Sequence, residues 1–208
     1  MDVGDFAGAL QSAQSARTLY ETLGDKRGIG LSLTNIGSVY LVLADYPNAL
    51  KFYRESLVAL QNIDKDAMLN ALGNIGIVCG IMRDYESALE RFRRCLSLAQ
   101  ELGDKKRIAT SLHNVGEALL RQSNVQDALR HFEEALKLRN ELNEKGEVAE
   151  TLLAIGETYL QIRREDEGVA LLKERLAIAV EIGARDLESL ACLRIGESLA
   201  IRKRKAQA

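Results

Sequence analysis

Apolar residues recur every three or four positions through nearly the whole chain, in segments separated by short polar stretches. This spacing is that of an amphipathic helix whose apolar face is turned toward a core. The clearest stretch runs from Leu33 to Ile63 and divides into two such helices around Asp45. Proline, which interrupts helices, occurs once in the 208 residues, so the pattern predicts an all-α protein.

The stretch from Leu33 to Ile63 is repeated along the chain. Its central Asn-Ile-Gly returns four times in altered form, and successive glycines stand 39, 40, 40 and 40 residues apart. These glycines are Gly37, Gly76, Gly116, Gly156 and Gly196. A second landmark, Asp-Tyr-x-x-Ala-Leu, begins at Asp45, returns at Asp84 and is looser around Val125. A repeat of this length predicts an α-solenoid, in which each unit contacts only its neighbours.

The repeats divide the chain into first and second helices joined by short linkers. First helices are expected over roughly residues 28–44, 67–83, 107–122, 147–163 and 187–202. Second helices are expected over roughly residues 47–63, 86–102, 126–142 and 166–182, preceded by residues 1–25 as the second helix of a partial repeat. The full repeats are residues 28–63, 67–103, 107–143 and 147–183, followed by a partial repeat over 187–202 and a basic tail over 203–208. This division starts the chain on a second helix, as expected of a protein trimmed at its N-terminus.

Each repeat glycine falls in the middle of a first helix, where glycine costs about 1 kcal/mol relative to alanine. Its return in five copies predicts a place where two helix backbones come close together. Ala49, Ala88 and Ala128 are expected to supply the small side chains that face the glycines, with Gly168 in the last full repeat. Pro47 is compatible with a helix because it falls in the first turn.

The order of landmarks in each copy resembles the tetratricopeptide repeat. The first full copy reads Gly37, Tyr40, Asp45-Tyr46, Ala49-Leu50 and Tyr53. The copies here are longer than the usual repeat of about 34 residues, lack its closing proline, and carry leucine or Cys192 in place of its early tryptophan. Longer repeats of this kind occur in Pins-type adaptors, kinesin light chains and bacterial regulators. The resemblance implies a right-handed superhelix whose concave groove, lined by the first helices, binds a peptide or helix of another protein.

The same resemblance implies which residues face that groove. The residue two before the repeat glycine is asparagine in three copies, and an amide can hold a peptide backbone or bond only to the neighbouring helix. The residue after the glycine is glutamate in the last three copies. The candidate peptide-binding residues are Asn35, Asn74, His113, Asn114, Glu117, Arg121, Glu150, Glu157, Gln161 and Glu197.

The glutamates have two interpretations. A row of carboxylates is commonly a solvated helix face. On a concave wall the like charges repel, and a basic ligand would relieve that repulsion. The first half of the same wall is apolar, with Leu31, Leu41, Val42, Ile77 and Ile81, so it is either an interaction surface or is covered by a missing helix or a second copy of the chain.

Composition and cysteine usage exclude several classes of function. The net charge of -2 argues against coating nucleic acid or an anionic membrane. We find no apolar run long enough for a membrane span and no signal peptide, which predicts a cytoplasmic protein. Cys79, Cys95 and Cys192 form no CxxC pair, so neither a zinc site nor a disulfide framework is expected, and each is interpreted as a small buried thiol.

No catalytic or cofactor motif is found. His113 and His131 fall on different helices, and the glycines follow the repeat instead of forming a phosphate loop. We therefore expect no enzyme activity, no metal and no cofactor. The basic run from Arg202 to Lys205 is either a localisation signal or a solvated helix end. The arginines at positions 91, 93 and 94 are expected to face solvent on a second helix.

Three functions are compatible with this sequence. The first is a non-enzymatic adaptor whose groove binds a partner segment with apolar residues at one end and basic residues at the other. The second is the sensory or regulatory module of a larger signalling protein, such as a kinase, a nucleotide cyclase or a transcription regulator. The third is self-association through the exposed ends of the solenoid.

Overall fold

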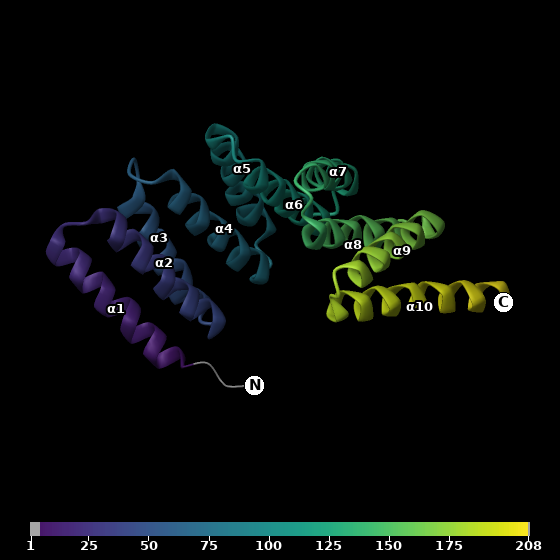
Figure 1. The fold of residues 1–208 in the computed structure, drawn as a ribbon, viewed down its shortest axis with the longest axis horizontal. Helices are drawn as coiled ribbons and strands as arrows, with labels where there is room; N and C mark the ends of the chain where they lie inside the picture. Colours follow the sequence, from purple (N-terminus) through teal and green to yellow (C-terminus); the bar gives the residue numbers. More distant parts are fainter. Residues whose placement is uncertain (1–4, 208) are drawn as a thin grey trace. The chain divides into compact units, whose positions relative to one another are not determined.

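The computed structural model describes the backbone of residues 5–207 and the side chains of residues 5–198 and 200. Within this range the chain forms ten α-helices and no strand, which confirms the all-α prediction (Figure 1). The helices are α1 (Phe6–Leu23), α2 (Lys26–Val42), α3 (Tyr46–Leu60), α4 (Lys65–Ile81), α5 (Tyr85–Leu102), α6 (Lys105–Arg121), α7 (Val125–Glu141), α8 (Lys145–Gln161), α9 (Glu165–Glu181) and α10 (Arg185–Gln207). None of the described helices is both long and apolar enough to cross a membrane.

Each predicted helix is present, but the first helices begin about one half-turn earlier than the sequence pattern indicated. The reason is the capping residue in the linker before them. Asp25, Asp64 and Asp104 each accept a hydrogen bond from the backbone N–H three residues further on. A side chain in this position satisfies one of the free N–H groups of the first turn and so fixes where the helix starts. The helix predicted over residues 1–25 corresponds to α1, which begins at Phe6; its predicted start at residue 1 lies outside the described residues.

Two kinds of turn separate the helices. The linkers between repeats contain a left-handed residue that ends the second helix, either glycine with φ of 67° or 68° at positions 24, 103 and 183 or asparagine with φ of 63° and 56° at positions 62 and 143. Inside each repeat the turn also contains a left-handed residue, which is not glycine. These residues are Ala44, Arg83, Ser123 and Arg163, with φ between 57° and 64°. Their residue types share no feature that would identify the turn from sequence.

The helices gather into two compact units that divide between Gly103 and Asp104. In the N-terminal unit α1 packs on α2, α2 on α3, α3 on α4 and α4 on α5. In the C-terminal unit the same succession runs from α6 to α10. First helices of adjacent repeats also touch inside each unit, α2 with α4, α6 with α8 and α8 with α10. Each element therefore packs on its near neighbours along the chain, which is the architecture of an α-solenoid.

The repeat glycines allow close contact between the two helices of a repeat, as predicted, but the partner is an aromatic ring. A Cβ on Gly37 would lie 2.8 Å from the ring of Tyr53, and one on Gly76 would lie 2.5 Å from the ring of Phe92. Gly116 has the same relation to Phe132. The alanines predicted to face the glycines are buried. The prediction holds in the third and fourth full repeats, where a Cβ on Gly116 would lie 3.1 Å from the carbonyl oxygen of Ala128 and one on Gly156 would lie 3.3 Å from that of Gly168. In the fourth full repeat the ring is replaced by Leu172, and the contact at Gly156 is looser.

The prediction that all three cysteines are buried is wrong for one of them. Cys79 and Cys95 are buried and Cys192 is exposed. In earlier copies the residue equivalent to Cys192 is a buried leucine, and the second helix of the same repeat packs on the helix that carries it. Cys192 lies on α10, and no described helix follows α10 to cover that face.

Candidate partner-binding surfaces

Three of the predicted glutamates lie close together in the C-terminal unit. Glu117 is on α6, and Glu150 and Glu157 are on α8, one first helix further along. Desolvation by burial is the main cause that raises the pKa of Glu117; the charge of Arg121 opposes this rise, and the carboxylates of Glu157 and Glu150 add to it. Because the Glu117 side chain remains 53% exposed, it is accessible to a ligand. We call Glu117, Glu150 and Glu157 the acidic face.

The acidic face is partly neutralised by Arg194 of α10. Its Nε lies 2.6 Å from Oε1 of Glu157, and its Nη1 donates to Glu197 at 3.1 Å. Glu157 and Glu197 therefore have a cationic partner in the same unit. Glu150 is exposed and makes no ion pair among the described residues. Glu157 on α8 and Glu197 on α10 therefore share Arg194 as a partner. Glu117 on α6 and Glu150 on α8 have no arginine or lysine as an ion-pair partner among the described residues.

Two buried arginines lie beneath this face, and sequence reasoning did not find either of them. Nη1 of Arg139 donates to the carbonyl oxygen of Glu147 at 2.7 Å and to the hydroxyl of Thr151 at 2.6 Å. Nη1 of Arg175 donates to the carbonyl oxygen of Leu187 at 2.7 Å. Burial lowers the pKa of both guanidinium groups. In the other full repeats the position of Arg139 holds leucine or alanine and that of Arg175 holds serine, cysteine or alanine, and this break in the pattern was the available signal.

The carboxylates above these arginines act in the opposite direction to burial. The nearby Glu150 raises the pKa of Arg139, and Glu157 and Glu150 raise that of Arg175. Arginine keeps its proton in proteins, so both guanidinium groups supply counter-charge from within the unit. The repulsion expected between glutamates on neighbouring repeats is reduced by residues of the second helices.

His113 does not supply charge to the acidic face. Its side chain is only 13% exposed, and its ring lies 5.3 Å from that of Phe132. Its Nε2 is 3.9 Å from Oε1 of Glu117. Burial, with a smaller contribution from the positive charge of Arg139, lowers the pKa of His113 to about 4, so the ring is neutral at pH 7.

The predicted asparagines are accessible to different degrees. Asn35 on α2 is exposed, while Asn74 on α4 and Asn114 on α6 are half-buried. None of the three amides makes a hydrogen bond among the described residues. Arg121 and Gln161 are exposed at the last positions of α6 and α8.

The N-terminal unit presents a different surface on its first helices. Ile77 and Ile81 on α4 are 43% and 49% exposed, and Val42 at the end of α2 is exposed as well. Leu31 and Leu41 on α2 are half-buried. We call Val42, Ile77 and Ile81 the apolar face. Ile77 occupies the repeat position that Glu117 and Glu157 occupy in the C-terminal unit.

The repeat pattern has a match among known protein families. The tetratricopeptide repeat matches residues 28–101, 67–141 and 107–181, which together span more than half of the chain. The chain belongs to the tetratricopeptide repeat family. No curated protein sequence matches it.

Solved structures with the same fold are distant in sequence. BtubC (BKLC) from P. vanneervenii is 15% identical with a TM-score of 0.73, and the match covers 96% of this chain and 92% of that one. A Rap protein complexed with Competence and Sporulation Factor is 16% identical with a TM-score of 0.77, covering 90% and 52%. A signal transduction ATPase with numerous domains from Pyrococcus horikoshii, which has a tetratricopeptide repeat sensor, is 15% identical with a TM-score of 0.82, covering 99% and 34%. At these identities the likeness shows the tetratricopeptide fold alone.

The side chains of this tetratricopeptide chain form no cluster of metal ligands in its described part. Among those residues no three histidine, cysteine, aspartate or glutamate side chains are placed to hold a metal ion. The two faces present carboxylates and exposed branched aliphatic groups.

Proposed function

We propose that this tetratricopeptide chain is a non-enzymatic scaffold that binds a segment of another protein on the face formed by its first helices. The observation that carries the proposal is the proximity of Glu117, Glu150 and Glu157, whose carboxylates act on one another across two repeats. Repulsion among these carboxylates raises the free energy of the folded chain while no ligand is bound. A cationic group of a ligand bound beside them would remove that repulsion.

The acidic face favours a partner segment with lysine or arginine residues. The free carboxylates of Glu117 and Glu150 are the expected contacts, because Glu157 already has Arg194 as a partner. Free amides at Asn114 and at equivalent positions would hold the backbone of that segment. The apolar face would take aliphatic side chains of the partner, since exposed aliphatic groups in a cluster commonly mark an interaction surface.

The Rap structure supports this mode of action by analogy. That protein has the same fold and is complexed with Competence and Sporulation Factor. The likeness extends to the fold, and the choice of partner has to come from the residues of the acidic and apolar faces.

The proposal can be tested with peptides selected on the purified chain. We expect a phage-displayed library to yield sequences enriched in lysine, arginine and aliphatic residues. Glu117→Lys should weaken binding of a selected peptide by about tenfold or more, because it replaces attraction by repulsion at the contact. Fluorescence anisotropy with a labelled peptide measures the change.

A matched control is available in the same unit. Glu133 is exposed on α7, a second helix, so Glu133→Lys changes the net charge by the same amount away from the acidic face. Equal loss of affinity in the two variants would show that only net charge matters and would contradict the proposal.

A second candidate function is favoured by the Pyrococcus horikoshii structure. There a tetratricopeptide sensor of the same fold is part of a larger signal transduction ATPase, of which the match covers 34%. We infer as an alternative that the chain acts as the sensory module of a larger signalling protein. The open reading frame tests this directly, because a catalytic or effector domain encoded beside the repeats would support it and a frame confined to repeats would reject it.

A further inference from the structure

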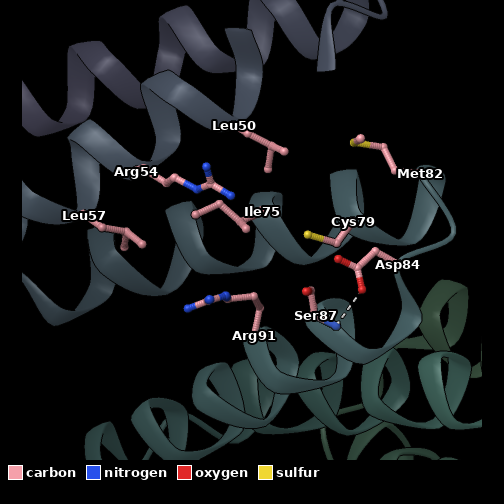
Figure 2. A pocket seen from close by; sticks show the side chains of 9 residues that line it. All are labelled: Leu50, Arg54, Leu57, Ile75, Cys79, Met82, Asp84, Ser87 and Arg91. Atoms are coloured by element: carbon pink, nitrogen blue, oxygen red, sulfur yellow. Dashed lines mark hydrogen bonds between the residues drawn. The ribbon is translucent and has the colours of Figure 1, made fainter. Parts of the chain in front are cut away.

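The N-terminal unit contains a cleft of about 460 Å³ between the two second helices α3 and α5, with α4 as its floor. Its apolar surface comes from Ile75, Cys79 and Met82 below and from Leu50 and Leu57 on the α3 side. Figure 2 shows these side chains turned toward a common space. The volume falls within the range of about 300–1,000 Å³ that is usual for small-molecule sites.

Two basic side chains border this cleft from opposite sides. Arg54 comes from α3 and Arg91 from α5, and Figure 2 shows them on either side of Ile75. The sequence had suggested that Arg91 faces solvent with its neighbours at 93 and 94. Instead its side chain is only 31% exposed, while the other two are exposed. The reason is its repeat position, which places it over the gap between α3 and α5.

Comparison with the other repeats explains why the space is open. Cys79 stands where other copies have Tyr40 and Tyr159, and Arg91 stands where the preceding copy has Phe52. In that copy the rings of Tyr40 and Phe52 stack with centroids 5.4 Å apart and fill the equivalent position. Replacing one ring by a thiol and the other by a flexible side chain removes that filling.

The charges around the cleft are incompletely paired. Arg54 is exposed and makes no ion pair among the described residues. In the part of the chain that the structure describes, Arg91 forms one ion pair, with its exposed neighbour Glu90, in which 3.6 Å separates Nη2 from Oε2. Asp84 at the rim is occupied in capping α5, where its carboxylate accepts the backbone N–H of Ser87 at 3.1 Å. Burial and the negative charge of Asp84 raise the pKa of the Cys79 thiol, and the positive charges of Arg91 and Arg54 act against that rise.

This cleft is separate from the surface assigned to the partner segment. Along α4 the cleft residues 75, 79 and 82 share one side of the helix. Ile77 and Ile81 lie on the opposite side, since successive helical residues turn by about 100°. A ligand in the cleft therefore leaves the apolar face free.

We propose that the cleft binds a small organic anion with an apolar body, in which a carboxylate is held by Arg54 and Arg91. Paired guanidinium groups suit a carboxylate because each offers several parallel N–H donors. The apolar body would lie on Ile75 and Cys79 in the space that Tyr40 and Phe52 fill one repeat earlier. The site requires neither the acidic face nor a protein partner, so its test is independent of the proposed scaffold function.

Three naphthalene probes of nearly equal size test the proposal. Binding of 2-naphthoate to the full chain is followed by ¹⁵N NMR titration, with neutral 2-naphthylmethanol and cationic 2-naphthylmethylamine as matched probes. We expect 2-naphthoate to bind at least about tenfold more tightly than the other two, because only its carboxylate has a charge opposite to that of the arginines and forms charge-assisted hydrogen bonds with them. Its largest shifts should fall on residues of α3, α4 and α5 that line the cleft.

Two sets of variants locate the site. Arg54→Gln and Arg91→Gln should each weaken 2-naphthoate about tenfold, whereas Arg94→Gln on the exposed side of α5 should have no effect. The double variant Cys79→Tyr with Arg91→Phe restores the ring pair of the preceding repeat and should abolish binding while the helical circular dichroism spectrum is retained. Undetectable 2-naphthoate binding at millimolar concentration, equal binding of all three probes, or unchanged binding by the filled variant would each overturn the proposal.

Discussion

Gly76 destabilises the helix α4 by about 1 kcal/mol relative to alanine, because glycine has a low helix propensity. Alanine does not fit there, since the ring of Phe92 occupies the space that a Cβ would need. Other glycines of the same helix have no such partner. Nothing lies within 4 Å of a Cβ built on Gly73 or Gly80. The repeat position, and not the residue type, therefore decides whether glycine is required.

This contrast predicts opposite effects for one substitution at two places in α4. Gly76→Ala should lower the free energy of unfolding by about 2 kcal/mol or more, because the ring has to move in a packed core. Gly73→Ala should raise it by about 0.5–1 kcal/mol through helix propensity alone. Urea unfolding followed by circular dichroism measures both, and a destabilised Gly73→Ala would contradict this explanation.

The buried ring of His113 predicts a dependence of stability on pH. Its pKa is about 4 in the folded chain, below the value of 6.5 that it has when exposed. The stability that depends on the neutral ring is therefore complete above about pH 6.5 and is lost as the pH falls toward 4. The expected loss is about 2–3 kcal/mol.

The next repeat carries leucine, Leu153, at the position of His113, so leucine is a natural replacement with which to test this prediction. His113→Leu should remove most of the decline in unfolding free energy between about pH 7 and pH 4.5. Urea titrations at the two pH values measure it. An unchanged decline in the variant would show that other groups cause it.

Among the elements, the sequence predicted each of the described helices, because apolar spacing is a local signal. It placed the helix starts late, since the caps Asp25, Asp64 and Asp104 stand just before the apolar pattern begins. It missed the buried Arg139 and Arg175 for a different reason. An arginine in a sequence is normally assigned to the surface because it is charged, and the burial of these two side chains between helices is visible only in the folded structure.

Arg139 links the second helix α7 to the first helix α8 and carries charge beneath the acidic face. We predict that Arg139→Leu, which introduces the residue found at this position as Leu60, leaves the helical content unchanged because apolar residues commonly replace buried charges without loss. A basic peptide should then bind about two- to fivefold more tightly, since counter-charge has been removed. Anisotropy titrations with the selected peptide check this, and weaker binding would show that Arg139 does not oppose the ligand.

At the scale of the whole molecule, the five glycines at regular spacing were enough to predict the repeat architecture, and the family match confirms it. The candidate site was predicted less completely. Glu117, Glu150 and Glu157 were identified from their repeat positions, but their pairing with Arg194 depends on how α8 and α10 pack. The cleft over Cys79 was not predicted, because it results from two replacements on different helices that become neighbours only after folding.

If the acidic face binds a basic segment of a partner protein, affinity for the selected peptide must depend on ionic strength. Fluorescence anisotropy between about 50 and 500 mM NaCl measures that dependence. The wild-type Kd should rise steeply with salt, and the double variant Glu117→Gln with Glu150→Gln should bind about tenfold more weakly at low salt with a shallower dependence. Equal Kd values and equal salt dependence for the two proteins would contradict the claim.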